Sequence, residues 1–227
     1  GSITYNAGGN LTFNRNDMIY MADAANVIPH QARAGHPLDS WFVYKTDGLY
    51  RTQEELDNSV TLPGSQLGDI NYVDVTGDGQ ITGDDMVRKY TSMTPEIQFG
   101  FNAGIEYKGL RLSMFLQGQT NAEVSVFSNY HWNKVLFQER WTPDNPDAKY
   151  PRAFERWDFH NERASDFWLV DASFLRIKNI TLSYNLPSAW ISPIGISGMR
   201  IYLRGRNIKT WDNMFAGFDP ERRGWDS

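Results

Sequence analysis

The stretch EIQFGFNAGIEYKGLRLSMFLQ, residues 96–117, decides the fold. Apolar side chains stand at the odd positions of 97–107, and Gln, Gly, Asn and Glu stand between them. Because successive side chains of a strand point to opposite faces, this period of two predicts a strand with one apolar and one polar face. Lys108-Gly109 predicts a tight turn, and the alternation resumes at Leu110. The stretch therefore predicts a β-hairpin.

The rest of the chain predicts three more strands, at 175–184, at 199–204 and, interrupted by Gly8-Gly9, at 3–13. Two of the connections are short, 108–109 and 186–198, and two are long, 14–94 and 121–166. Loops of that length are uncommon in a compact soluble domain. Strands of about ten residues, with short turns on one side and long loops on the other, are typical of an outer-membrane barrel.

A soluble β-sandwich is the alternative, because its strands alternate in the same way. The polarity of the second face bears on the choice. That face carries Gly, Asn, Ser, Gln and Thr with Arg200, Arg204 and Arg206, a composition that suits a wet barrel interior as well as a protein surface. Aromatic residues near the predicted strand ends, among them Tyr107, Trp168 and Tyr184, suit the membrane–water interfaces of a barrel. Both architectures stay open on these observations.

Composition narrows the function. Aromatic residues make up 14% of the 227 residues, which argues against disorder, and the net charge of −5 argues against nucleic acid as a partner. The absence of Cys excludes disulfides, thiolate zinc sites and cysteine nucleophiles. The chain has no run of about 18 apolar residues and begins without an export signal. We therefore expect it to be a piece of a longer protein.

Residues 74–85, DVTGDGQITGDD, match the twelve-position calcium loop. A hard cation needs six to eight oxygens, and alternate residues of a tight loop can point theirs inward. Gly79 would permit the sharp turn. The predicted ligands occupy positions 1, 3, 5, 7 and 12 of the loop: Asp74, Thr76, Asp78, Gln80 and Asp85. Thr at the third position and Asp at the twelfth predict weaker binding than a standard loop. The alternative is a Gly/Asp turn that binds no metal.

The remaining chemistry-bearing residues form weaker patterns. The four histidines have no ligand-like spacing, and Asp144 with Asp147 could only be imagined as a glycosidase acid and base. Trp132, Trp157 and Arg204 are candidates for contact with a substrate, because Trp rings can stack on sugars or peptide side chains. Such residues also commonly pack a loop together. No catalytic residues are expected.

Several segments resemble the C-terminal part of a TonB-dependent outer-membrane transporter of the SusC/RagA type. They occur in the order of that family and cover nearly the whole chain, so the ordered set is more specific than any one of them. The segments are 35–49 (GHPLDSWFVYKTDGL), 53–56 (QEEL), 68–79 (GDINYVDVTGDG), 140–146 (RWTPDNP), 148–151 (AKYP), 165–184 (SDFWLVDASFLRIKNITLSY) and 207–211 (NIKTW).

The resemblance implies an all-β fold, an antiparallel transmembrane β-barrel segment of about five strands from a 22-stranded barrel. It implies import of oligosaccharides or oligopeptides across the outer membrane of a Gram-negative bacterium. The implied partners are the TonB complex, a SusD-like surface lipoprotein and membrane lipid, in a dimer of transporter–lipoprotein pairs. Residues 1–227 would be the C-terminal barrel section, with 14–94 and 121–166 as extracellular loops. The family's N-terminal plug and last strand are not in this sequence.

Two rival functions remain beside the transporter. The first is a secreted, calcium-stabilised, carbohydrate-binding β-sandwich, which would fold alone in water. The second is a glycoside hydrolase, which would lose turnover on substitution of one loop carboxylate. In the transporter, the Asp74–Asp85 loop would bind structural Ca²⁺, and a five-stranded segment with a lipid-facing side would need further strands to close.

Overall fold

A computed structural model describes residues 2–24, 26–127, 134–153, 159–214 and 218–221. The chain divides into two compact units, which are described separately. The first, called the sheet unit, contains Gly1–Asn14, Pro95–Ala122 and Ala172–Asn213. The second, called the loop unit, contains Arg15–Thr94, Glu123–Asp171 and Met214–Ser227. No helix in the described ranges is long and apolar enough to cross a membrane.

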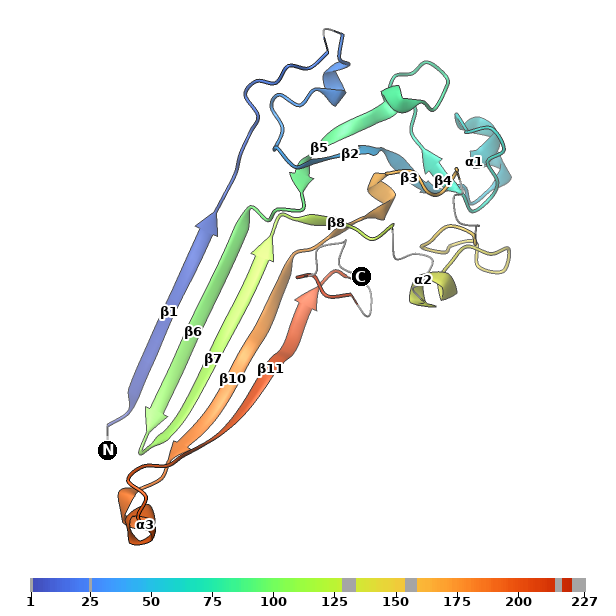
Figure 1. The fold of residues 1–227 in the computed structure, drawn as a ribbon. Helices are drawn as coiled ribbons and strands as arrows, with labels where there is room; N and C mark the ends of the chain where they lie inside the picture. The colour runs from blue at the N-terminus through green and yellow to red at the C-terminus, as the bar shows by residue number, and fades with distance from the viewer. Residues whose placement is uncertain (1, 25, 128–133, 154–158, 215–217, 222–227) are drawn as a thin grey trace. The chain divides into compact units, whose positions relative to one another are not determined.

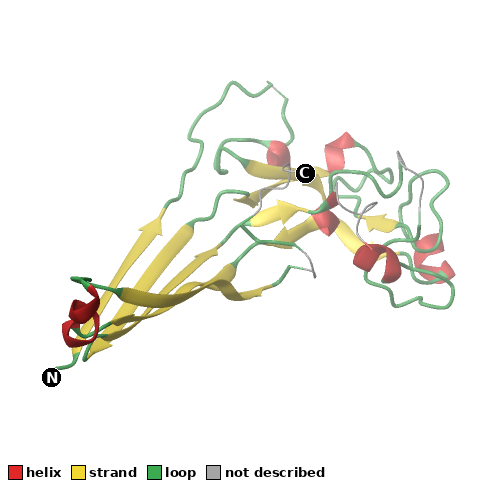
Figure 2. Ribbon diagram, turned by 60° about the horizontal axis from the view of Figure 1, so that its bottom comes forward, coloured by secondary structure: helices red, strands yellow, loops and turns green. Residues whose placement is uncertain are grey.

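The sheet unit is one antiparallel sheet of five long strands that lie side by side in both views (Figures 1 and 2). Their order across the sheet follows their order in the chain, so each strand pairs with the one before it in this unit. The strands are β1 (Thr4–Phe13), β6 (Ile97–Tyr107), β7 (Leu110–Thr120), β10 (Phe174–Asn185) and β11 (Arg200–Asp212). All five strands predicted from the sequence are therefore present.

The central hairpin forms as predicted. Tyr107 pairs with Leu110, which leaves Lys108 and Gly109 as a two-residue turn, both with positive φ (49° and 83°). That conformation matches the right-handed twist of the flanking strands, and glycine adopts it without a Cβ penalty. The other short connection, 186–198, contains α3 (Ser188–Ile191) and a 3-10 helix, Ser192–Ile194. Figure 2 shows this connection at the same end of the sheet as the N-terminus.

The strand register sorts the side chains onto two faces. One face is apolar across every strand, since Leu11 pairs with Phe99, Ile105 with Leu112, and Leu182 with both Leu112 and Leu203. Many of its large side chains are exposed: Tyr5, Leu11, Phe13, Phe101, Ile105, Tyr107, Leu110, Leu112, Leu175, Leu182, Ile201, Leu203 and Trp211. The other face carries Asn, Gln, Ser, Thr and Arg. The chain is thus all-β in its main architecture, with an amphipathic sheet.

The loop unit has its own short elements and its own core, although the sequence predicted only long loops there. Its strands form three antiparallel pairs, β2–β5, β3–β4 and β8–β9. The strands are β2 (Ser40–Tyr44), β3 (Thr46–Leu49), β4 (Ile70–Tyr72), β5 (Met86–Ser92), β8 (Glu123–Ser125) and β9 (Leu169–Asp171). The helices are α1 (Gln53–Asn58), α2 (Lys134–Gln138) and the 3-10 helices Pro29–Gln31, Gly83–Asp85 and Asp166–Trp168.

Local sequence explains the start of α1. Thr52 accepts a hydrogen bond from the Glu55 amide, and the Glu55 carboxylate accepts from the Thr52 amide at 3.2 Å. This reciprocal capping satisfies two of the N–H groups that a helix start leaves unpaired.

The core of the loop unit corrects one expectation. Trp168 was predicted at a membrane–water interface, yet it is 1% exposed, its ring meets the Phe127 ring edge-on, and its Nε1 donates to the Asn161 carbonyl. Tyr107 and Tyr184 do lie together on the apolar face, because each pairs with Leu110 at the hairpin end of the sheet. Trp168 precedes β10 (Phe174–Asn185) in the chain and does not belong to that strand. The prediction that it lies at a strand end was therefore wrong.

Candidate functional site

Arginine side chains gather on the polar face of the sheet. The pairing of β10 with β11 places Arg200, Arg204 and Arg206 on that face, as the sequence predicted. Arg204 Nε donates to Thr181 Oγ1 at 3.2 Å, and Arg200 Nε donates to Asn185 Oδ1 at 2.7 Å. A guanidinium carries five N–H donors, so one such bond leaves donors for a hydroxyl or carboxylate of a solute. Contact of Arg204 with a substrate stays a prediction.

The two tryptophans proposed as substrate contacts, Trp132 and Trp157, lie outside the described residues. Trp141 is described and packs against Gly68, where an added Cβ would come within 2.5 Å of the indole ring. Gly68 also has a φ of +83°, which disfavours any other residue there. Trp141 therefore holds the loop unit together.

The Asp74–Asp85 loop is closed by its last residue. The Asp85 side chain is fully buried, and its Oδ1 accepts from the Val75 and Thr76 amides at 2.9 and 3.0 Å. The Thr76 hydroxyl lies 3.0 Å from the same oxygen. Oδ2 accepts from the Thr82 amide at 2.7 Å, and Thr82 caps the 3-10 helix Gly83–Asp85. Asp85 thus ties the start of the loop to its end.

Asp74 organises the middle of the loop. Its Oδ1 accepts from the Gly77 amide at 2.7 Å and its Oδ2 from the Gly79 amide at 2.8 Å. These backbone bonds, that from Gly79 first, hold the pKa of Asp74 below its ordinary value against a smaller opposing effect of desolvation. Asp78 Oδ1 accepts from the Gln80 amide at 2.9 Å. The carboxylates of the loop therefore accept hydrogen bonds mainly from its own backbone.

The loop presents fewer free oxygen ligands than a bound cation needs. Across the described ranges, no three His, Cys, Asp or Glu side chains come close enough together to hold a metal ion. The four donors around Asp85 occupy about as many sites as a carboxylate offers. Asp74 is half-buried and Asp78 is exposed, and both bear carboxylate oxygens, the atoms that Ca²⁺ prefers. Calcium binding stays a prediction.

A buried ionic cluster supports the other end of the loop unit. The Asp69 side chain is fully buried, and its Oδ1 accepts from Asn161 Nδ2 at 2.7 Å and lies 2.6 Å from Arg152 Nε. Oδ2 accepts from the Gln66 amide at 2.8 Å. Burial and, second, the charge of Asp69 raise the pKa of Tyr50 to about 12. The cluster joins segments far apart in the sequence and has a structural role.

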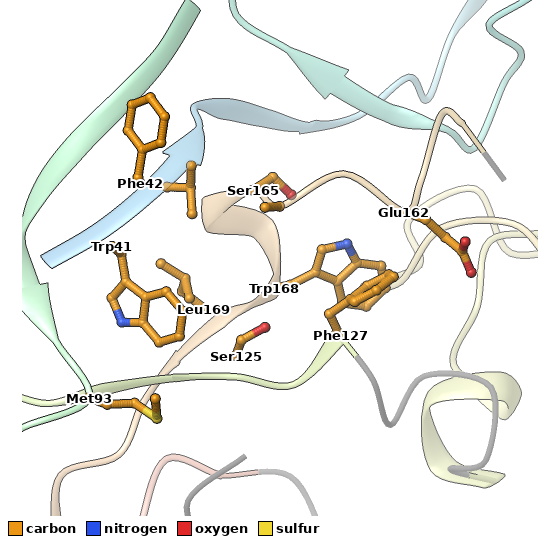
Figure 3. A pocket seen from close by; sticks show the side chains of 11 residues that line it. Trp41, Phe42, Met93, Ser125, Phe127, Glu162, Ser165, Trp168 and Leu169 are labelled. Atoms are coloured by element: carbon orange, nitrogen blue, oxygen red, sulfur yellow. The ribbon is translucent and has the colours of Figure 1, made fainter. Parts of the chain in front are cut away.

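A cavity of about 310 Å³ lies wholly inside the loop unit. We call it the aromatic cavity. Figure 3 shows the indoles of Trp41 and Trp168 on opposite sides of it, with Leu169 and Ser125 between them. Among the described residues, the lining is Trp41, Phe42, Val43, Met93, Ser125, Phe127, Glu162, Ala164, Ser165, Trp168 and Leu169.

Sequence reasoning missed the aromatic cavity. Its lining comes from four stretches of the chain, 41–43, 93, 125–127 and 162–169, and no short motif marks them. Six of its residues lie inside segments that carry the family resemblance: three in 35–49 (Trp41, Phe42 and Val43) and three in 165–184 (Ser165, Trp168 and Leu169). Those segments are the available signal, and they point to family membership without indicating a cavity.

Comparison with known proteins gives consistent relatives. No family model matches the chain. TonB-dependent receptor P26 of Formosa agariphila is 32% identical over 182 residues, 77% of this chain and 18% of that protein. TonB-dependent receptor P3 of the same organism is 26% identical over 96% of this chain and 23% of its own length. TonB-dependent receptor SusC of Bacteroides thetaiotaomicron is 24% identical over 96% of this chain and 22% of its own length.

Solved structures of RagAB share the fold. A chain of the RagAB peptide transporter superposes with a TM-score of 0.64 at 24% identity, over 96% of this chain and 24% of that one. A chain of the RagAB peptide importer in its closed-closed state gives 0.63 at 25% identity, over 96% and 25%.

The sequence relatives bear names of receptors, and the structural neighbours are titled as transporters or importers of peptides. The chain spans about a quarter or less of the length of the relatives it matches. It aligns with them through the long strands of the sheet unit as well as through the loop unit, since the matches cover 96% of its residues. The chain is therefore part of a TonB-dependent transporter of the SusC/RagA type.

Proposed function

We propose that the sheet unit is a section of a transmembrane β-barrel through which a Gram-negative bacterium imports nutrients across its outer membrane. The observation that carries this proposal is the exposed apolar face, which runs without a break across all five strands. Leu203 in β11 is 76% exposed and Leu11 in β1 is 73% exposed, on the two edge strands of the sheet. A soluble sandwich would bury this face as its core, whereas lipid would surround it in a barrel.

The polar face would then line the water-filled interior. Transmembrane barrels alternate apolar residues outward with polar residues inward, and the register sorts the side chains in that pattern. Arg200, Arg204 and Arg206 would contribute positive charge to the interior. The segments 14–94 and 121–166 would be the extracellular loops. Transport needs binding and conformational change and no catalytic residue, in keeping with relatives that are named as receptors.

The substrate would be an oligosaccharide or an oligopeptide, taken up in a cycle driven by the TonB complex. A SusD-like lipoprotein would cover the barrel mouth, in a dimer of transporter–lipoprotein pairs. The similarity to SusC and to RagAB chains supports this assignment of partners.

The test uses the full-length receptor in its own membrane. We expect it in the outer-membrane fraction, as a heat-modifiable barrel that co-purifies with a surface lipoprotein identified by mass spectrometry. Deleting its gene should abolish growth on one class of oligosaccharide or peptide, and restoring the gene should restore that growth. Recovery of the receptor as a monodisperse soluble protein would overturn the proposal.

We propose in addition that the Asp74–Asp85 loop binds Ca²⁺ as a structural ion. The twelve-residue spacing supports this, together with the half-buried carboxylate of Asp74 and the exposed carboxylate of Asp78. Asp78→Ala should abolish calorimetric Ca²⁺ binding by the full-length receptor. Asp84→Ala, which removes a neighbouring exposed carboxylate outside the ligand spacing, is the matched control. Equal binding by the two variants would exclude the loop as the site.

A further inference from the structure

We propose that three arginines on the polar face of β11, Arg200, Arg204 and Arg206, bind carboxylate groups of the solute that the receptor takes up. We call these three residues the arginine strip. The inference rests on the proposed function for the passage of a solute along the polar face. It goes further than that function, because it assigns a binding site and the charge of its ligand.

The arginine strip lies on one face of a single strand, β11, which is the neighbour of β10 (Figure 1). Its residues stand at even positions of the strand, so their side chains share a face. At the usual strand rise, Arg200 and Arg204 are about 13 Å apart along the strand, and Arg204 and Arg206 are about 7 Å apart. All three residues are exposed. A solute that lies along β11 can therefore meet all three guanidinium groups at once.

The residues around the strip do not neutralise its charge. The cross-strand partners of the three arginines on β10 are uncharged: Asn185, Thr181 and Asn179. Arg111 of β7 pairs with Ser183, which in turn pairs with Tyr202 of β11, so this row of the sheet adds further positive charge. In the part of the chain that the structure describes, none of the three arginines takes part in an ion pair.

The strip has donors left for an anion. The bonds to Asn185 and Thr181 use the Nε atoms of Arg200 and Arg204, and they hold these side chains against the sheet. The two Nη groups at the end of each guanidinium stay available, and their fork matches the two oxygens of a carboxylate. The Arg204 guanidinium also lies 5.7 Å from the centre of the Tyr202 ring. Two of the three arginines are therefore oriented before a ligand binds.

The charge of the sheet unit favours an anionic ligand. The whole chain has a net charge of −5, yet the sheet unit contains eight Lys and Arg residues against three Asp and Glu residues. Positive charges about 7 Å apart on one strand repel one another, and a carboxylate bound between them relieves that repulsion. A neutral solute can accept hydrogen bonds from the strip but gains no such relief. The strip should therefore prefer a solute with carboxylates to a neutral one of equal length.

The carboxylates can belong to an acidic peptide or to an oligosaccharide of uronic acids. In an extended peptide, the side chains of alternate residues stand about 7 Å apart on one side, the same spacing as that of Arg204 and Arg206. In an oligosaccharide of uronic acids, every ring carries a carboxylate. Both ligands present the same chemical group to the strip, so the experiment includes one probe of each kind.

The first experiment measures binding of matched probes to the full-length receptor in detergent by calorimetry. The acidic probes are tetraglutamate and tetragalacturonate, and their neutral counterparts are tetraglutamine and maltotetraose. We expect at least one acidic probe to bind about tenfold more tightly than its neutral counterpart, and to weaken as salt is added, because salt screens exposed charges. The acidic probe that binds more tightly identifies the source of the carboxylates.

Variants of the strip test the site itself. Arg204→Gln and Arg206→Gln should each weaken that acidic probe about two- to fivefold, as expected for one exposed ion pair, and the double variant should weaken it about tenfold. Arg204→Lys keeps the charge without the fork and should retain part of the affinity. Lys108→Gln removes an exposed positive charge at the hairpin turn and is the matched control, which should bind like the wild type.

The inference is overturned if neither acidic probe binds, if the neutral probes bind as tightly, or if the double variant binds like the wild type. It is also overturned if Lys108→Gln weakens binding as much as the double variant, or if an experimental structure shows carboxylates of the receptor itself on the arginine strip. None of these results removes the proposed function, because such a receptor can still import neutral solutes. A soluble receptor would overturn the proposed function, and its binding of the probes could still be measured.

Discussion

At the scale of single residues, Asp85 has a role that differs from the one its motif position suggested. As the twelfth residue of a calcium loop it was predicted to face a cation. The structure gives its oxygens four donors from the loop itself, at Val75, Thr76 and Thr82. Metal or not, the carboxylate fastens the loop, because a buried acceptor with charge-assisted bonds is costly to replace.

Asp85→Asn should therefore loosen the loop even in the presence of a chelator. One side-chain oxygen becomes an NH₂ group that faces backbone N–H donors, and an unsatisfied buried group costs about 1–3 kcal/mol. Hydrogen exchange of the Val75, Thr76 and Thr82 amides should rise by one to two orders of magnitude. Asp84→Asn makes the same change in charge at an exposed neighbour and should leave these amides protected. Equal exchange in both variants would exclude a fastening role.

The raised pKa of Tyr50 predicts how the stability of the loop unit changes at alkaline pH. Its pKa is about 12 in the folded state against 10.0 for an ordinary tyrosine, because burial and then the charge of Asp69 disfavour the phenolate. Between those values the folded state retains a proton that the unfolded state loses, so stability falls as pH rises from 10 to 12. The slope from this group is at most about 1.4 kcal/mol per pH unit.

Tyr50→Phe should flatten that slope, as measured by denaturant titrations of the receptor between pH 8 and pH 12. The variant loses only a long hydrogen bond, 3.5 Å from the hydroxyl to the Val60 carbonyl, so its stability at pH 8 should change little. Tyr5→Phe, at an 82% exposed position, is the control and should keep the wild-type slope. An unchanged slope in Tyr50→Phe would contradict the prediction.

At the scale of elements, the sequence predicted the strands that are long and regular. Period two over residues 97–107 and a two-residue turn fix both the register of β6 against β7 and the face that each side chain occupies. The bounds were less accurate. β11 was predicted only to residue 204 and continues to Asp212. The irregular pairing between Ile177 and Asn179 and the positive φ of Asn207 interrupt the alternation beyond that point.

The loop unit could not be predicted for a different reason. Its strands are three to seven residues long, too short for a clear period, and distant segments hold it together. The Tyr44 amide donates to the Ala164 carbonyl, and the Ile70 amide donates to Asn161 Oδ1. Contacts across 90 residues or more leave no local pattern in the sequence. The sequence alone therefore could not predict the aromatic cavity or the place of Ser165 in it.

Close packing between strands gives a test at Gly118 in β7. An added Cβ there would collide with the Phe99 ring and lie 2.7 Å from the Phe174 backbone oxygen, and the backbone atom cannot rotate away. Gly118→Ala should therefore destabilise the sheet by about 1–3 kcal/mol. Gly198→Ala, where a Cβ meets nothing within 4 Å, is the control. The temperature at which the detergent-solubilised receptor unfolds, followed by its heat-modifiability, should fall in the first variant only. Equal unfolding temperatures for the two variants would refute the packing argument.

At the scale of the whole molecule, the two units are built for different surroundings. The loop unit buries Trp168, Leu136 and Ile70 in a core of its own, as a water-soluble domain does. The sheet unit buries few side chains of this kind, and its large apolar residues lie on an exposed face. An apolar surface of that extent is normally covered by a protein partner or a membrane. The proposed barrel assigns it to lipid.

Two neighbouring positions in the middle of β6 allow a test of whether lipid or water surrounds the apolar face. Phe101 lies on the apolar face at 43% exposure, and Asn102 lies on the polar face. Near the bilayer midplane an arginine on the lipid side costs about 2–4 kcal/mol, whereas an arginine at an exposed position in water costs within about 0.5 kcal/mol. Phe101→Arg should therefore sharply lower the yield of receptor that folds into lipid vesicles, and Asn102→Arg should fold nearly as well as the wild type. Equal folding of the two variants would mean that the apolar face does not meet lipid, and the barrel assignment would then be wrong.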